Sequence, residues 1–164
     1  MPLPETPLWA FSEEDQHFMA LALRHAEEAA EGGDVPVGAV VVGPRGELLA
    51  AAGNRRQRDQ DPTAHAEILA LRQAAQALGS WRLVHCTLYV TVEPCPMCAA
   101  ACVLARLGQL VYGAKDPKLG FVGSLANLLE DPRLHHRVAW RGGLLADQAA
   151  GVLQAFFAKR RKSR

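Results

Sequence analysis

Two short motifs carry the residues of this chain that are most capable of chemistry. The first is His65-Ala66-Glu67 and the second is Pro94-Cys95-Pro96-Met97-Cys98. Two cysteines separated by two residues at a strand-to-helix turn present both thiolates to one point, and the positive end of the helix stabilises their charge. With His65 they form a set of three zinc ligands. Three protein ligands that leave a fourth position to water are typical of a catalytic zinc site.

Glu67 adds a carboxylate two residues from the histidine. Two thiolates and a neutral imidazole cancel the charge of Zn²⁺, so such a zinc acidifies its water less than one held by three neutral histidines. A general base is therefore needed beside the water, and we predict that Glu67 is this base. A Cys-x-x-Cys pair also occurs in redox pairs and in structural zinc sites, and these two alternatives stay open. The chain has no second such pair to complete a four-cysteine site.

The other cysteines and histidines are weaker candidates. Cys102 lies in an apolar run and Cys86 precedes a predicted strand, so both are expected to be buried thiols. His17 and His25 have no partner at ligand spacing and are expected to be packed or solvated. The pair His135-His136 lies in a polar loop, where it is either a surface feature or a contact to substrate.

The elements that must position these motifs alternate between strands and helices. Ser12 and the three acidic residues after it begin a helix that reaches Glu31, and Asp61-Pro62-Thr63 opens another that ends at Gly79. Strands are expected over residues 35–42, 47–53, 87–92, 109–113 and 138–140, and further helices over 96–107 and 146–161. The first two strands form a hairpin, and the strand–helix–strand unit over 87–113 predicts a parallel, right-handed crossover. The expected fold is a three-layer α/β/α architecture with a central mixed sheet of about five strands and helices on both faces.

The composition fits one globular domain. The chain has 164 residues, of which 49% are hydrophobic and 21% charged, so we expect a single domain over residues 1–164. The longest apolar run, 98–105, is far shorter than the roughly 20 residues that span a membrane. The first basic residue is Arg24, so the N-terminus lacks the basic region of a secretory signal. We expect a cytoplasmic protein with no membrane association and with reduced cysteines.

Charge is strongly polarised along the chain. Residues 1–34 carry eight acidic residues and one basic residue, whereas residues 133–164 carry eight basic residues and one acidic residue. The final nine residues, 156–164, place five basic side chains behind Phe156 and Phe157. Such a patch suits nucleic acid, because cations contact phosphates and aromatic rings stack on bases. The alternative is a solvated helix end whose cations interact with the helix dipole.

The motifs together resemble a known enzyme group. His-x-Glu followed by Pro-Cys-x-x-Cys is the signature of the zinc-dependent cytidine and deoxycytidylate deaminases. Over roughly residues 12–162 the chain is similar to one branch, the bacterial tRNA-specific adenosine deaminases. The similarity extends beyond the metal motifs to the stretches 35–40, 54–55, 61–68, 89–95, 123–125, 143–147 and 156–157.

The resemblance implies a cytidine deaminase-like fold and hydrolysis of the wobble adenosine of a tRNA anticodon to inosine. It also implies one zinc per subunit held by His65, Cys95 and Cys98, with Glu67 as the proton shuttle. The expected partners are a tRNA anticodon stem-loop and a second copy of the chain in a homodimer. The residues that it assigns to substrate binding are Asn54, Ala66, Asp116, Lys118, His135, Phe156, Phe157, Arg160 and Arg161.

The chain departs from the family pattern at two places. His135 stands where family members often have asparagine, and the segment 118–124 is bulkier and more apolar than the common Lys-Thr-Gly-Ala-Ala-Gly-Ser. Both departures concern substrate fit and leave the chemistry unchanged. Two other functions are weighed against the tRNA reaction. A deaminase of free bases or nucleotides has no use for the basic tail, and a non-catalytic zinc-stabilised RNA-binding module has no use for Glu67.

Overall fold

The computed structural model describes residues 10–163, so residues 1–9 and Arg164 lie outside the described residues. Five strands form one mixed sheet in the order β2-β1-β3-β4-β5. Strand β1 pairs antiparallel with both β2 and β3, whereas β3, β4 and β5 run parallel to one another. The strands are β1 (Gly38–Val42), β2 (Leu48–Gly53), β3 (Thr87–Val92), β4 (Gln109–Ala114) and β5 (Ala139–Gly142).

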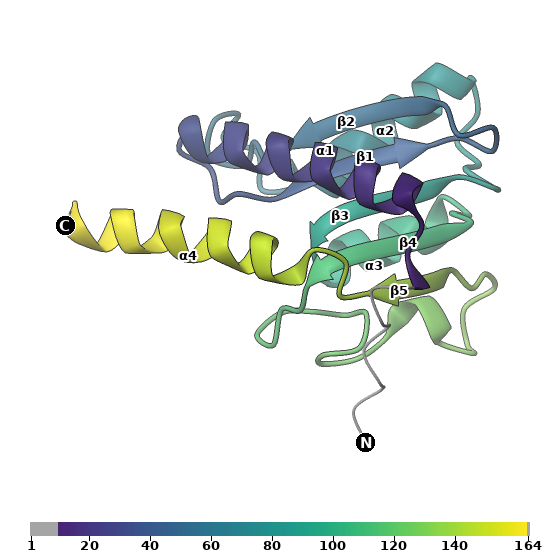
Figure 1. Cartoon of the computed structure of the whole chain (residues 1–164). Helices are drawn as coiled ribbons and strands as arrows, with labels where there is room; N and C mark the ends of the chain where they lie inside the picture. The colour runs from purple at the N-terminus through teal and green to yellow at the C-terminus, as the bar shows by residue number, and fades with distance from the viewer. Residues whose placement is uncertain (1–9, 164) are drawn as a thin grey trace.

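Helices cover both faces of this sheet, as Figure 1 shows. They are α1 (Glu13–Glu31), α2 (Ala66–Leu78), α3 (Pro96–Leu104) and α4 (Ala146–Lys162), with a short 3-10 helix η2 (Leu128–Glu130). Because successive strand residues point to opposite faces, Val41 and Leu88 pack with α2 and α3, while Val40 and Tyr89 pack with α1. The expected three-layer α/β/α fold with a mixed five-stranded sheet is confirmed.

Local sequence signals act at the start of α1. The Ser12 hydroxyl accepts a hydrogen bond from the backbone N–H of Asp15, and the Asp15 carboxylate accepts one from the N–H of Ser12, each at 3.0 Å. This reciprocal pair satisfies two N–H groups that the first helical turn leaves without partners. The predicted N-terminal cap at Ser12 is therefore confirmed.

Three predicted boundaries are wrong by three to five residues. Strand β1 begins at Gly38 and not at Val35, because the carbonyl of Val35 accepts hydrogen bonds from Val37 and from the Asn54 side chain before strand pairing begins. Helix α2 begins at Ala66 and not near Asp61, whose carboxylate instead closes a turn onto the backbone and side chain of Thr63. Helix α3 ends at Leu104 and not at residue 107.

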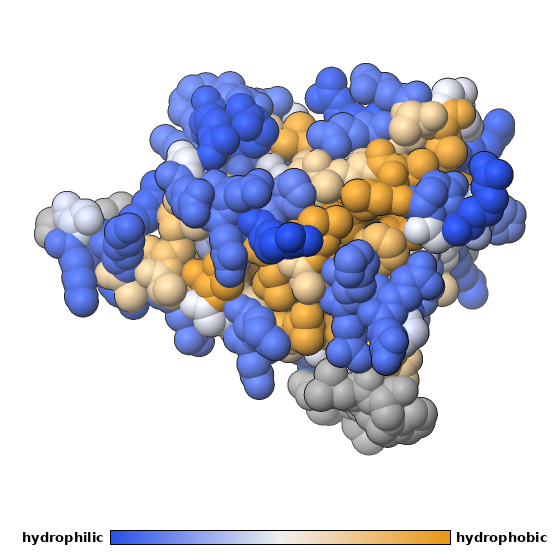
Figure 2. Space-filling model, turned by 45° about the horizontal axis from the view of Figure 1, so that its top comes forward, coloured by the Kyte–Doolittle hydropathy of each residue, from blue (hydrophilic) through white to orange (hydrophobic). Residues whose placement is uncertain are grey.

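The strand directions bring the functional segments to one edge of the sheet. Since β3 and β4 are parallel, their carboxyl ends lie together, and residues 93–98 come next to residues 115–124. Helix α4 starts at the same edge after β5 and projects away from the body of the molecule (Figure 1). In Figure 2 its projecting end shows hydrophilic side chains next to moderately hydrophobic ones. Among the described residues, no helix combines the length and apolar character needed to cross a membrane.

Candidate active site

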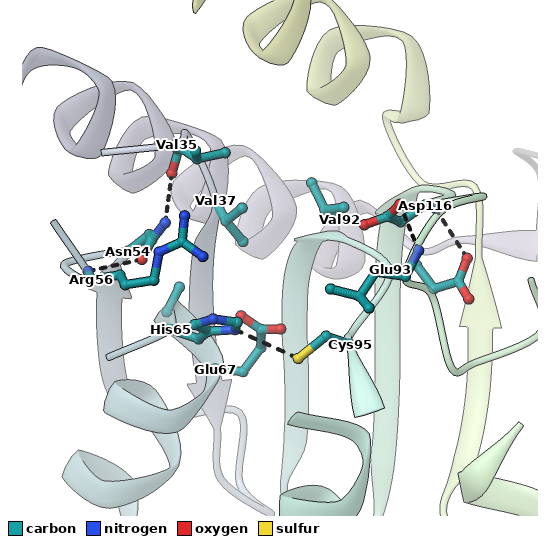
Figure 3. Close-up of a pocket in the computed structure, with 12 residues that line it drawn as sticks. Val35, Val37, Asn54, Arg56, His65, Glu67, Val92, Glu93, Cys95 and Asp116 are labelled. Carbon is teal, nitrogen blue, oxygen red and sulfur yellow. Dashed lines mark hydrogen bonds between the residues drawn. The ribbon is translucent and has the colours of Figure 1, made fainter. Parts of the chain in front are cut away.

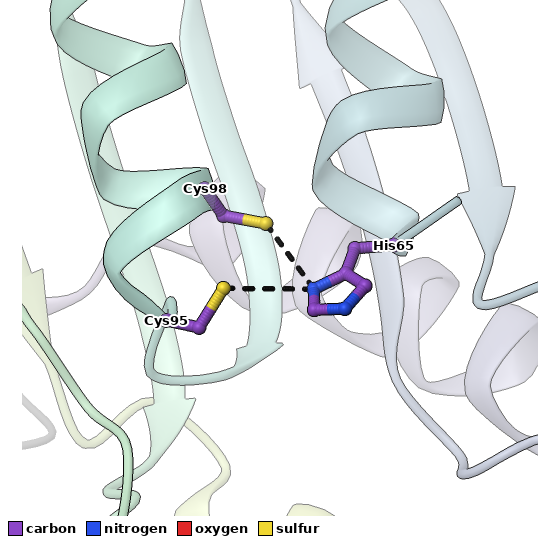
Figure 4. Close-up of side chains that lie close together, drawn as sticks. All are labelled: His65, Cys95 and Cys98. Carbon is purple, nitrogen blue, oxygen red and sulfur yellow. Dashed lines mark hydrogen bonds between the residues drawn. The ribbon is translucent and has the colours of Figure 1, made fainter. Parts of the chain in front are cut away.

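Three side chains from two helix starts converge on one point. The Nδ1 atom of His65 lies 3.6 Å from Sγ of Cys95 and 3.4 Å from Sγ of Cys98 (Figure 4). Tetrahedral zinc with Zn–S of about 2.3 Å and Zn–N of about 2.0–2.1 Å requires an N···S separation of roughly 3.5 Å. The three ligand atoms lie within 4.8 Å of one another. The geometry of these residues therefore fits a tetrahedral metal ion with an open fourth position.

The backbone explains this convergence. His65 is the N-cap of α2, and Cys95 is the N-cap of α3 with Pro96 at the first helical position. The predicted helix start at Asp61 would place His65 inside the helix, and this is wrong, because the His65 backbone is extended with ψ of 150°. Both helix starts thus point their positive ends toward the same site, where they favour thiolates.

The two thiols differ in their proton affinity. Hydrogen bonding to Cys98 and to His65 lowers the pKa of Cys95 to about 4 although burial opposes this. The same hydrogen bond, together with burial, raises the pKa of Cys98. Cys95 is therefore a thiolate at neutral pH even without a cation, and a bound divalent cation would remove the proton of Cys98 as well.

Glu67 lies on the first turn of α2, immediately behind the ligand set. Its side chain is 4% exposed, and burial raises the pKa of its carboxyl group. The nearby His65 and Cys98 side chains and a backbone hydrogen bond oppose this rise. A raised pKa makes the Glu67 carboxylate a stronger proton acceptor than a solvent-exposed glutamate, which suits a general acid–base residue.

His65, Glu67 and Cys95 form the floor of a pocket of about 130 Å³. Figure 3 shows Asn54 and Arg56 on one side of the pocket and Glu93 and Asp116 on the other. The lining comprises Val35, Val37, Asn54, Arg56, His65, Ala66, Glu67, Val92, Glu93, Cys95, Asp116 and Leu119.

The first wall is held by side-chain amides and carboxylates. Asn54 donates from Nδ2 to the Val35 carbonyl at 3.1 Å and accepts from the Arg56 N–H at 3.1 Å. One N–H and one acceptor site of the Asn54 amide therefore remain for a ligand. Asp34, which is 1% exposed, accepts from the N–H groups of Gln57 and Arg58 and so anchors the segment after β2.

The second wall follows β4. The Asp116 carboxylate accepts hydrogen bonds from the N–H groups of Lys118 and Leu119 at 3.0 and 3.2 Å, which turns the chain. Asp116 and Leu119 line the pocket, whereas the exposed Lys118 lies just outside the lining. This wall contains the segment 118–124 that departs from the family pattern.

The tail residues lie on α4, away from the pocket lining. Phe156 and Phe157 meet edge to face with ring centroids 5.4 Å apart, and the Arg160 guanidinium lies 5.1 Å from the Phe156 ring centroid. The last turn contains Lys159, Arg160, Arg161 and Lys162. The structure therefore collects the aromatic and basic groups on one projecting helix end.

His135 is at the opposite edge of the sheet from the pocket. It precedes β5, and the ring of the neighbouring His136 contacts the carbonyl of Leu107, which precedes β4, at 2.9 Å. Because β3, β4 and β5 are parallel, this is the amino-terminal edge. The structure thus does not bring His135 to the pocket of its own chain.

Sequence reasoning missed Asp34, Arg56 and Glu93. Glu93 had a signal, since it is an acidic residue directly after a buried strand and next to the ligand motif. Asp34 and its partner Gln57 are 23 residues apart, and no local pattern connects them. The expectation that Cys86 and Cys102 are buried thiols is confirmed.

The comparisons with known proteins agree on one group of enzymes. The model of the MafB19-like deaminase family matches residues 13–161. The chain is 47% identical to the tRNA-specific adenosine deaminase of Bacillus subtilis over 92% of this chain and 93% of that protein. It is also 47% identical to the enzyme of the same name from Agrobacterium fabrum, covering 90% of this chain and 97% of that protein.

Solved structures extend this similarity to the fold. One, from a study of A-to-I editing by tRNA:A34 deaminases, superposes with a TM-score of 0.80 at 47% identity, covering 84% of this chain and 99% of the other. A guanine deaminase from Nitrosomonas europaea superposes with a TM-score of 0.75 at 25% identity, covering 95% of this chain and 87% of the other.

Proposed function

Since the chain belongs to the MafB19-like deaminase family and is 47% identical to tRNA-specific adenosine deaminases, we propose that it hydrolyses the wobble adenosine of a tRNA anticodon to inosine, with release of ammonia. The observation that carries the proposal is a buried carboxylate, Glu67, beside three converging metal ligands at the floor of a pocket. The five-stranded sheet and its helices support a single deaminase domain over residues 1–164.

His65, Cys95 and Cys98 are the residues that would hold one zinc ion per chain. Their donor set of one nitrogen and two sulfurs matches the preference of zinc, and their separations match its tetrahedral coordination. When bound, zinc polarises a water molecule and so makes it a nucleophile near neutral pH. A structural zinc site would not need the open position or Glu67.

Glu67 moves the protons of the reaction. Its carboxylate takes one proton from the attacking water and delivers it to N1 of adenine as the water oxygen bonds to C6. It then takes the second proton from that oxygen and delivers it to the amino nitrogen. The C6–N bond breaks, ammonia leaves, and C6 becomes the carbonyl carbon of inosine. Adenosine and one water thus yield inosine and ammonia, and Glu67 ends as it began.

Substrate recognition is divided between the pocket and the tail. Asn54 and Ala66 would contact the base, while Asp116 and Lys118 would contact the neighbouring nucleotides at the rim. The α4 residues Phe156, Phe157, Arg160 and Arg161 would contact the stem-loop, the aromatic rings by stacking and the cations through phosphates. A target base in a single-stranded anticodon loop enters the pocket at low cost, because it leaves no base pair.

The chain would act as a cytoplasmic homodimer. Leu104 at the end of α3 is 63% exposed, which supports this helix as part of the interface. In such a dimer, His135 of one chain would contact the pocket of the other chain. Sedimentation of the active protein is expected to give twice the chain mass of 17.7 kDa, and full activity of the monomer would contradict the dimer.

Mass spectrometry of RNA tests the reaction directly. A stem-loop with adenosine at the wobble position is expected to gain inosine on incubation with the zinc-loaded protein, while the same loop with the adenosine at another position is not. Deamination of free guanine or adenine without reaction of the stem-loop would favour the free-base alternative.

A further inference from the structure

Glu93 is a buried carboxylate that the reaction leaves unassigned. It lies between the end of β3 and the ligand Cys95, and it is 3% exposed. A carboxylate withdrawn from water to this degree is costly unless hydrogen-bond donors surround it. Its surroundings therefore indicate what it does.

All the donors around Glu93 come from one segment after β4. Its Oε1 atom accepts from the N–H of Asp116 at 3.1 Å and from the Ser124 hydroxyl. Its Oε2 atom accepts from the N–H groups of Val122 and Ser124, each at 3.0 Å. Three backbone amides and one hydroxyl thus converge on a single carboxylate, and a carboxylate attracts such donors more strongly than a neutral acceptor does.

The segment 116–124 wraps closely around this carboxylate. A Cβ atom at Gly120 would lie 2.2 Å from Glu93 Oε2 and 2.5 Å from the Asp116 carbonyl, so only glycine fits there. The N–H of Phe121 also donates to the Pro94 carbonyl at 2.9 Å. The segment is therefore tied to residues 93–94 by both side-chain and backbone contacts.

The same segment provides the second wall of the pocket through Asp116 and Leu119. The metal ligands and Glu67, in contrast, are positioned by the starts of α2 and α3. Glu93 hence connects the metal-ligand motif that follows it in the sequence to the segment 116–124, which forms the second wall of the pocket. We propose that Glu93 is a positioning residue that fixes the segment 116–124 as the wall against which the substrate binds. This inference rests on the proposed function.

Glu93→Gln separates positioning from chemistry. The glutamine amide replaces one acceptor oxygen by a donor that faces the N–H groups of the segment, so the wall loses part of its anchor. We expect the KM for the wobble-adenosine stem-loop to rise about tenfold or more, the effect of losing one hydrogen bond to a charged group. The kcat is expected to stay within about threefold, with zinc content as in the wild type, because interactions that bind substrate and transition state equally affect KM.

Glu130→Gln is the matched control. Glu130 lies later in the same β4–β5 connection, is exposed, and accepts a hydrogen bond from the Trp140 ring N–H at 2.8 Å away from the pocket lining. Its KM and kcat are expected to equal those of the wild type. An unchanged KM in Glu93→Gln, a loss of zinc, or a fall in kcat without a rise in KM would overturn the proposal.

Ser124→Ala keeps the test decisive if Glu93→Gln does not fold. It removes only the hydroxyl donor and leaves the three backbone donors in place. A KM raised about two- to threefold with unchanged kcat supports the positioning role, and an unchanged KM overturns it. Absence of inosine with the wild-type protein would instead count against the proposed function, so the two failures are distinguishable.

Discussion

The pocket floor and the end of α4 hold their functional side chains in opposite ways. Glu67 in the floor and the metal ligand Cys98 beneath it are buried, and the first turns of two helices packed on the sheet position them. In α4, Ala149 is the one buried residue among those described, and Phe157 is 41% exposed. In the proposed function, the chemistry therefore depends on fixed geometry, whereas RNA binding by the tail depends on its positive charge and its exposed position. Substitutions in the floor should abolish activity, whereas substitutions in the tail should each reduce activity only partly.

Removal of the proton shuttle is expected to have the largest effect. Glu67→Gln keeps the shape of the side chain but cannot accept a proton. We expect at least about a 100-fold loss of kcat, since general acid–base catalysis contributes at least that much, with zinc content and melting temperature near those of the wild type. Glu27→Gln, the same substitution at an exposed position of α1, serves as the control. A loss smaller than about tenfold would remove Glu67 from the mechanism.

Loss of one metal ligand should be as severe for activity. Cys95→Ser is expected to release zinc, measured by elemental analysis of the dialysed protein, and to abolish deamination. Cys102→Ala tests whether a nearby buried thiol matters in the same way. It should keep its zinc and lose only about 1–2 kcal/mol of unfolding free energy, because Cys102 packs in the core. Retained zinc in Cys95→Ser would contradict the ligand assignment.

Deletion of residues 156–164 should weaken RNA binding and leave the floor intact. Each phosphate contact contributes about −0.7 to the slope of log affinity against log salt, so losing two or three contacts flattens the slope by roughly 1.5 to 2. Zinc content should equal that of the full chain. If the slope is unchanged in the folded, truncated protein, the tail has no phosphate contacts and the free-base reaction gains support.

A single aromatic substitution in the tail should have the smallest effect of the series. Phe157→Ala removes one stacking surface, which is worth about 1–3 kcal/mol of binding free energy and is largely independent of salt. Arg161→Ala is the matched variant. It should change the slope of log affinity against log salt by about 0.7 and should leave the salt-independent part of the binding free energy almost unchanged. Equal salt slopes for the two variants would contradict the division between stacking and phosphate contact.

The sequence predicted most of the architecture, since that information is local. Apolar runs marked all five strands, and Ser12 with Asp15 marked the start of α1. The end of α3 shows where local signals fail. Leu107 N–H bonds to the Cys102 carbonyl and Arg106 N–H to the Val103 carbonyl, a helix-ending motif that usually has glycine in its left-handed position. Here Arg106 holds that position with φ of 57°, so the usual glycine signal is missing.

By itself, the sequence determined which residues can do the chemistry. His65 and the general base Glu67 lie at the start of one helix, and Cys95 and Cys98 lie at the start of another, so their spacing is visible in the sequence. The tertiary structure decided what surrounds them. Glu93 and Asp34 reach partners more than 20 residues away, and these pairings exist only after the sheet has formed. The parallel direction of β3, β4 and β5 likewise separates His135 from the pocket while it brings Asp116 to the pocket wall. Spacing along the chain encodes contacts within one turn of a helix, but contacts across the sheet depend on the order and direction in which the strands pair.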